Sequence, residues 1–106
     1  MAYDLLIRNA RICDGSGGPS FRGDVAVRSG RIAAVGEIEA GAAETIDANG
    51  LVLAPGFIDP HTHYDAQLVW DGLAQPALEH GVTTIVPGNC SLSLAPLRPE
   101  HRDLLG

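Results

Sequence analysis

The first half of the chain alternates short apolar runs with polar and glycine-rich segments. Residues 24–28 alternate polar and apolar side chains, and Ser29-Gly30 separates them from residues 31–35, which are mainly apolar. Because glycine adopts the positive φ that a two-residue turn requires, this pattern predicts a β-hairpin. The Gly-rich residues 14–20 predict a loop. The apolar positions expected to face a core are Leu5, Ile7, Ile12, Val25, Val27, Ile32 and Val35.

The hydrophobic pattern changes near residue 55. Residues 51–54 form a continuous apolar run, Pro55-Gly56 breaks it, and residues 57–61 follow as a second short apolar segment. Continuous hydrophobicity is typical of strands that are covered on both faces, as in a parallel sheet. We therefore expect these segments to be buried strands.

A helix and a further strand are expected after residue 72. Residues 73–80 have helical spacing of apolar side chains, and Gly81 stands where a helix C-terminus favours a left-handed residue. Residues 82–86 are β-branched and predict a strand. Strand, helix and strand in this order predict a βαβ unit with parallel strands. The sequence thus predicts a β region over residues 1–54 and the start of an α/β structure over residues 55–106.

Composition narrows the class of protein. The chain has 106 residues, with 7 Arg, no Lys and 13 acidic residues, so its formal net charge is −6. This balance excludes a basic nucleic-acid-binding module, because no cationic stripe is available to neutralise phosphates. No run approaches the roughly 20 apolar residues of a membrane span, and no signal-peptide pattern opens the chain. We expect a cytoplasmic protein that has neither nucleic acid nor a membrane as its partner.

The chemistry-bearing residues gather after the two predicted parallel strands. His61-Thr62-His63 stands at the C-terminal end of the first strand, and residues i and i+2 of a strand point to the same side, so two imidazoles can share one metal ion. Asp59 lies on that side and is expected to accept an imidazole N–H. Cys90 follows the second strand, at the same edge of the sheet. Two imidazoles and a thiolate suit Zn²⁺; the alternatives are solvent-facing or core histidines and a small buried cysteine.

The remaining titratable and nucleophilic residues have structural interpretations. Asp71 is a plausible N-cap for the segment at residue 73, and His80 precedes a helix end where a cation is favoured. His101 is expected on the surface near a second helix, and Tyr64 either touches substrate or is an exposed loop aromatic. Cys13 lies far from any His and is expected to be a small buried residue, without a disulfide to Cys90.

Several motifs together resemble the N-terminal signature of the amidohydrolase superfamily. A second group, Pro87-Gly88-Asn89-Cys90 followed by Ser93-Leu94-Ala95-Pro96, is similar to the N-acyl-D-amino-acid deacylases, also called D-aminoacylases. Their motif usually has Gly and Phe after the cysteine, where this chain has Ser91 and Leu92. The segments that carry the superfamily resemblance are residues 4–9, 24–36, 46–50 and 54–63.

The resemblance implies a fold and a ligand set. The fold would be a partial N-terminal β-sandwich over residues 1–54, followed by the first βαβ unit of a TIM-like (β/α)8 metal-dependent hydrolase barrel over residues 55–106. The motif carries metal-ligand roles onto His61, His63 and Cys90, with Cys90 able to bridge two metal positions. It implies one tightly held Zn²⁺ and a second, weaker site.

The implied reaction is hydrolysis of an N-acyl-D-amino acid to a carboxylate and a D-amino acid by a zinc-activated water. The general-base Asp of the family has no counterpart among the 106 residues, and no substrate-binding residue is assigned. A closed barrel needs about 250 residues, so we expect an inactive fragment whose partners are the rest of the barrel or a second copy. The alternatives are a cyclic-amide hydrolase of the hydantoinase or dihydroorotase type and a non-catalytic structural module.

Overall fold

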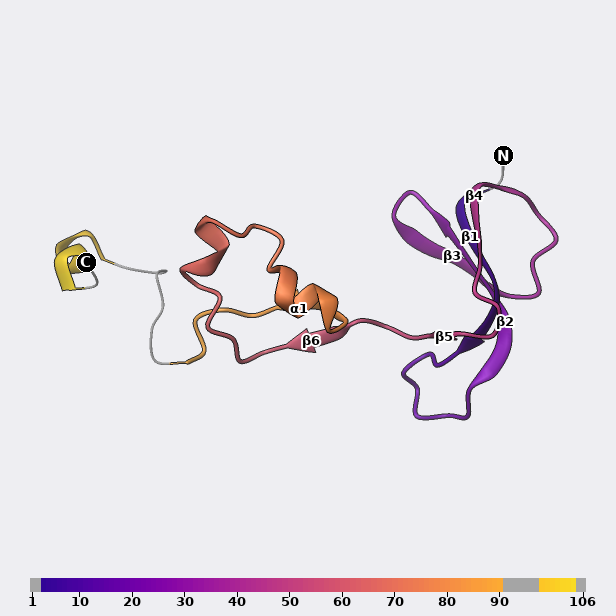
Figure 1. Ribbon diagram of the computed structural model, residues 1–106, viewed down its shortest axis with the longest axis horizontal. Coiled ribbons are helices and arrows are strands. Elements are labelled where there is room, and N and C mark those ends of the chain that lie inside the picture. The colour runs from indigo at the N-terminus through magenta and orange to yellow at the C-terminus, as the bar shows by residue number, and fades with distance from the viewer. Residues whose placement is uncertain (1–2, 91–97, 105–106) are drawn as a thin grey trace. The chain divides into compact units, whose positions relative to one another are not determined.

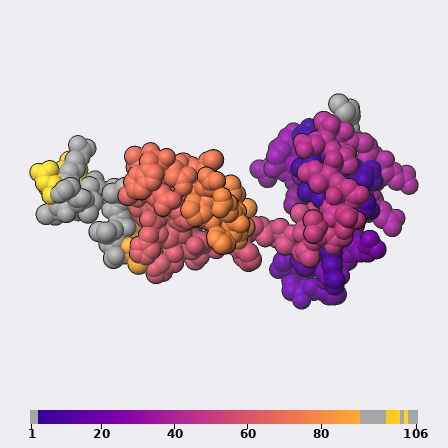
Figure 2. Space-filling model, viewed as in Figure 1, coloured from indigo at the N-terminus to yellow at the C-terminus, as the bar shows by residue number. Residues whose placement is uncertain are grey.

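A computed structural model describes residues 3–90 and 98–104 of the chain. The chain divides into two compact units, Met1–Pro55 and Gly56–Gly106, and the first is seen as the indigo-to-magenta group of atoms in the space-filling view (Figure 2). Residues 91–97, which include the second part of the deacylase motif, lie outside the described residues. No helix among the described residues is long and apolar enough to cross a membrane.

The first unit is a five-stranded sheet built around its longest strand (Figure 1). Strand β1 pairs antiparallel with β2, which pairs antiparallel with β3. On its other edge β1 pairs in parallel with β4 and, farther along, with β5. The strands are β1 (Tyr3–Ile12), β2 (Phe21–Arg28), β3 (Arg31–Gly36), β4 (Ala42–Asp47) and β5 (Val52–Leu53).

The predicted hairpin is confirmed. Arg28 of β2 pairs with Arg31 of β3, and Ser29 and Gly30 both have positive φ, 52° and 71°. Two successive positive φ values match the right-handed twist of the flanking strands, so the turn brings β2 and β3 together without splaying them. The predicted loop over residues 14–20 is also confirmed, since it separates β1 from β2.

The sheet of the first unit is apolar on both faces. Leu6 and Ala26 are fully buried and pack with Ile38 on one face. The register places Ile32 and Val35 on the opposite face, beside Val27 and Val25, but their side chains are 70% and 50% exposed. The expectation that Ile32 and Val35 face a core is therefore wrong for the described residues, because alternation indicates a shared face and not whether the chain covers it. They line an open apolar hollow of about 310 Å³.

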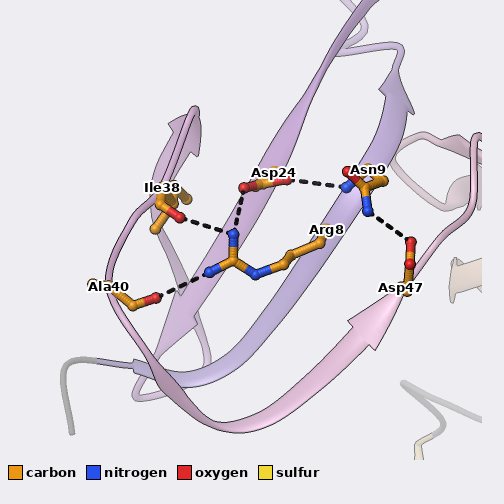
Figure 3. Close-up of polar contacts among 6 residues, drawn as sticks. All are labelled: Arg8, Asn9, Asp24, Ile38, Ala40 and Asp47. Carbon is orange, nitrogen blue, oxygen red and sulfur yellow. Dashed lines mark hydrogen bonds and ion pairs between the residues drawn. The ribbon is translucent and has the colours of Figure 1, made fainter.

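An arginine inside β1 anchors the segment that follows β3 (Figure 3). The Arg8 guanidinium donates from Nη1 to Asp24 Oδ2 at 3.3 Å and to the carbonyl of Ile38 at 3.0 Å. Its Nη2 reaches the carbonyl of Ala40 at 3.4 Å. Because a guanidinium donates in several directions at once, one side chain holds the chain on its return toward β4.

A bulge in β1 follows directly after this arginine. Asn9 has a φ of 56°, the strand register shifts between Ile7 and Ala10, and the Asn9 backbone N–H donates to Asp24. The Asn9 Nδ2 donates to Asp47 Oδ1 at 3.0 Å, which lowers the pKa of the Asp47 carboxyl, and the backbone N–H of Asn49 lowers that pKa further. The bulge thereby ties the middle of β1 to the end of β4.

The second unit contains the predicted βαβ arrangement. Strands β6 (Phe57–Asp59) and β7 (Val82–Ile85) pair in parallel, and helix α1 (Gln75–Glu79) lies between them in sequence. A short 3-10 helix, η1 (Gln67–Val69), precedes α1, and another, η2 (Pro99–Leu104), follows β7.

Helix α1 is shorter than the sequence predicts. It begins at Gln75 with a proline in its first turn, and Asp71 Oδ2 accepts the backbone N–H of Gln75 at 3.1 Å. Asp71 therefore satisfies a free N–H of the first turn, although the residue at the N-cap position is Ala74. Gly81 ends the segment with a φ of 83°, as expected.

Strand β6 of the second unit is largely uncovered by the described residues, since the side chains of Phe57 and Ile58 are 70% and 68% exposed. Leu51 and Val52, which lie in the first unit, are also exposed. The prediction that these segments are covered on both faces is therefore wrong within the described part of the chain. Continuous hydrophobicity indicates strands of a larger sheet. Among the described residues α1 contacts β7, but the side chains of Phe57 and Ile58 stay exposed.

Candidate metal centre

The carboxyl ends of β6 and β7 carry the candidate ligands. The ladder between them closes with Asp59 opposite Ile85, and the backbone N–H of Val86 donates to the carbonyl of Asp59 at 2.8 Å. His61 and His63 follow the end of β6, and Cys90 follows β7 after a turn. Because the strands are parallel, all three side chains come from the same edge of the sheet.

The structure brings these three side chains together. The possible ligand atoms of His61, His63 and Cys90 all lie within 4.8 Å of one another. The two imidazole rings are tilted by 47° with centroids 6.1 Å apart. Both histidines are exposed and Cys90 is half-buried. Both histidines stand beyond the last strand residue, Asp59, so strand alternation alone does not bring their rings to one side.

The donor set fits a zinc ion. Zinc binds imidazole nitrogen at about 2.0–2.1 Å and thiolate sulfur at about 2.3 Å, so two donors on one tetrahedral ion lie roughly 3.3–3.6 Å apart. The three ligand atoms lie within 4.8 Å of one another, which exceeds the separation on a tetrahedral zinc ion by at most about 1.5 Å. Rotation of the exposed imidazoles supplies this difference. Two nitrogens and one sulfur are also the borderline-soft donors that zinc prefers.

Contacts around the ligands hold the two segments in place. Asp59 Oδ1 accepts the backbone N–H of His61 at 3.1 Å, so this carboxylate orients the backbone, in place of the predicted contact to an imidazole. Thr62, between the two histidines, is 4% exposed, and its hydroxyl has no hydrogen-bond partner among the described residues. Asn89 Nδ2 donates to the carbonyl of Pro60 at 2.9 Å.

Sequence reasoning missed the contact of Asn89. A signal was present, since Asn89 sits between the Pro87-Gly88 turn and Cys90, where a short amide side chain can bond to backbone. Nothing in the sequence indicates that the acceptor is Pro60, 29 positions away. The pairing of the two strand ends brings them together.

The other residues singled out in the sequence are exposed or form local contacts. His80 is the exposed C-cap residue of α1, and His101 is exposed within η2. Tyr64 is half-buried, and its carbonyl accepts the N–H of Leu68. Cys13 is exposed and unpaired, so the expectation of a buried Cys13 is wrong. It follows the last residue of β1, beyond the buried part of the strand.

Comparison with known proteins places the chain in a family. The amidohydrolase family matches residues 44–106. An N-acyl-D-aspartate deacylase of Alcaligenes xylosoxydans xylosoxydans is 50% identical over 97% of this chain and 22% of its own length. An N-acyl-D-glutamate deacylase from Bordetella bronchiseptica, solved with zinc and a phosphonate inhibitor, is 45% identical with a TM-score of 0.83, over 89% of this chain and 20% of its own.

A further structure concerns the metal directly. A D-aminoacylase, in a study of the functional role of its binuclear metal centre, is 45% identical with a TM-score of 0.84, over 90% of this chain and 20% of its own. The chain thus spans about a fifth of the length of the curated relatives that it matches. With the family match over more than half of its residues, this chain belongs to the amidohydrolase family.

Proposed function

We propose that the chain is the N-terminal portion of a zinc-dependent N-acyl-D-amino-acid deacylase. The observation that carries the proposal is the convergence of His61, His63 and Cys90, whose ligand atoms lie within 4.8 Å of one another at one edge of a parallel strand pair. The identity to the deacylase relatives extends over 97% of the chain. Hydrolysis of an N-acyl-D-amino acid to a carboxylate and a D-amino acid is the proposed reaction.

The proposed architecture has two parts. Residues 1–54 belong to a β-sandwich and residues 55–106 to the first βαβ unit of a (β/α)8 barrel. The parallel pairing of β6 and β7 supports the second part, and so does the exposure of Phe57 and Ile58, which neighbouring barrel elements would cover. The apolar hollow lined by Ile32 and Val35 supports the first part, since the inner face of a sandwich sheet is apolar.

In this mechanism the residues of the chain hold the metal. His61 and His63 would bind zinc as neutral imidazoles, and Cys90 as a thiolate, which can also reach a second, weaker metal position. Bound zinc polarises an acyl carbonyl and lowers the pKa of a water molecule toward neutrality. Asp59 orients the histidine segment through the backbone of His61. No described residue stands in the position of a general base, so proton transfer to the leaving amine needs a carboxylate from outside the chain.

Activity measurements test this proposal. We expect the full-length protein to hydrolyse an N-acyl-D-amino acid faster than a hydantoin, and the isolated 106-residue chain with added Zn²⁺ to hydrolyse neither. Faster turnover of the hydantoin would favour the cyclic-amide hydrolase. A full-length protein that binds zinc and hydrolyses neither compound would favour the non-catalytic module. Turnover by the isolated chain would contradict the proposal that the general base lies outside the 106 residues.

The location and partners of the protein are part of the same proposal. We propose a cytoplasmic enzyme that acts on a small N-acyl amino acid; its formal net charge of −6 favours solubility and implies no further partner. The rest of the barrel is the proposed partner of the exposed strand faces. Self-association of the isolated chain through these faces is the proposed outcome when that partner is missing.

A further inference from the structure

The last hydrogen bond between the two ligand-bearing segments is made by a side chain. The β6–β7 ladder ends at Asp59 and Ile85, and one backbone bond, from Val86 to Asp59, follows it. Beyond that point the chain turns through Gly88, which has a φ of 84°. Asn89 Nδ2 then donates to the carbonyl of Pro60 at 2.9 Å. Residues 86–90 thus depart from the ladder and are tied back to the other strand end by this amide.

The position of this bond in the two segments is specific. Asn89 immediately precedes Cys90, and Pro60 immediately precedes His61. The bond therefore runs from the side chain of the residue before Cys90 to the backbone of the residue before His61. A change in the separation of Asn89 and Pro60 moves the Cys90 sulfur relative to the imidazoles, because each end of the bond lies on the residue directly next to a ligand.

We propose that Asn89 is a positioning residue of the metal centre, holding the Cys90 thiolate at bonding distance from the ion that His61 and His63 bind. This inference rests on the proposed metal-dependent function. Removing a hydrogen bond made directly to a metal ligand typically weakens metal affinity 10–100-fold, and we expect an effect within that range from a bond that joins the two residues next to His61 and Cys90. The Asn89 amide donates to a backbone carbonyl, so the contribution that we propose for it is to the geometry of the ligand set.

The fold itself does not need this side chain. Asn89 is exposed and lies outside the β6–β7 ladder and α1, so truncating it leaves the pairing of Ile58 with Thr84 and of Asp59 with Ile85 intact. If a variant loses metal affinity while its metal-free form keeps its stability, Asn89 positions the ligands and is not needed for folding.

The test compares four variants of the full-length protein. Asn89→Ala removes the amide, and Asn89→Asp keeps its size but has no N–H to donate to the carbonyl of Pro60. Asn89→Gln retains a donor on a side chain one methylene longer. Gln75→Ala is the matched control, because it removes an amide that donates to Glu79 in α1 of the same unit.

Two readouts report on the metal, and one reports on folding. Zinc affinity is measured by competition with a chromophoric chelator, and the cobalt-substituted protein is examined for thiolate-to-cobalt absorption. We expect Asn89→Ala and Asn89→Asp to bind zinc 10–100-fold more weakly and to lose thiolate absorption. Asn89→Gln should recover part of both, Gln75→Ala should match the wild type, and the metal-free variants should unfold at the wild-type midpoint.

The outcomes separate this inference from the proposed function. Wild-type zinc affinity and cobalt absorption in Asn89→Ala and Asn89→Asp would overturn the positioning role, whatever the activity. An equal loss of affinity in Gln75→Ala would also overturn it, since the effect would then not depend on the strand ends. A wild-type protein that binds metal through Cys90 but hydrolyses no N-acyl-D-amino acid would refute the deacylase proposal and leave the role of Asn89 supported by affinity.

Discussion

The two units of the chain bury their side chains very differently. In the first unit Leu6, Ala10 and Ala26 are fully inaccessible, and Ile12, Val25 and Ile38 are also buried. In the second unit the buried side chains among the described residues are Thr62, Ala74 and Ala77, all small. Yet the candidate metal ligands all belong to the second unit. The second unit, which contains the candidate ligands, has the smaller core, because a parallel strand pair is buried only when other elements pack on both of its faces.

The cysteines give the largest expected contrast between the units. Cys90→Ala should weaken zinc binding at least about a hundredfold, since a structural zinc site is worth roughly 10–16 kcal/mol shared among its ligands. Cys13→Ala should leave it unchanged, because Cys13 is exposed in the first unit. Metal content after dialysis against a chelator measures both. An unchanged zinc content in Cys90→Ala would show that Cys90 is a packing residue and not a metal ligand.

The second contrast lies within the first unit. Leu6→Ala should lower the free energy of unfolding by about 2–5 kcal/mol, because it empties a fully buried site. Ile32→Ala should lower it by less than about 0.5 kcal/mol, since Ile32 is 70% exposed. Urea unfolding of the 106-residue chain, followed by circular dichroism, gives both values. A cost for Ile32→Ala near that of Leu6→Ala would show that another copy covers this face.

The third prediction concerns the close approach of β6 and β7. A Cβ at Gly56 would overlap the Thr83 side chain, including its Cβ, which cannot rotate away. Gly56→Ala should therefore cost about 1–3 kcal/mol of stability in the second unit, as overpacking does. Gly72→Ala is the control, because a Cβ there meets nothing within 4 Å. Hydrogen exchange of the backbone amides of β7 distinguishes the two variants. Equal protection from exchange in both would contradict the close approach of Gly56 to Thr83.

The smallest effect is a titration in the first unit. Asn9→Gly keeps the positive φ at this position but removes the donor to Asp47, so the pKa of Asp47 should rise toward its ordinary value. A lowered folded-state pKa adds stability above the pKa of the unfolded chain, and this stability is lost as the pH falls through the folded value. Asn9→Gly should thus reduce the acid dependence of stability. Carboxyl NMR titration measures the shift, and an unchanged pKa would contradict it.

The sequence by itself determined the local elements and the candidate ligands. Ser29-Gly30 indicated the hairpin, the β-branched segment at residue 82 indicated a strand, and the order strand, helix, strand indicated parallel pairing. Cys90 was added to His61 and His63 because parallel strands bring their carboxyl ends to one edge, whereas the strand alternation used to pair the two histidines does not apply, since β6 ends at Asp59. These features depend on turn chemistry and on periodicity, which are properties of short segments.

Only the tertiary structure decided which distant segments pair and which apolar faces are covered. The parallel pairing of β4 with β1 and the bond from Arg8 to Ile38 join segments that no periodicity relates. The exposure of Ile32 depends on what lies over its face, which alternation does not encode. The bond from Asn89 to Pro60 exists because two strand ends meet across 29 positions of sequence. The sequence thus determined which residues meet at the candidate metal centre, and the paired strands decided what holds them there.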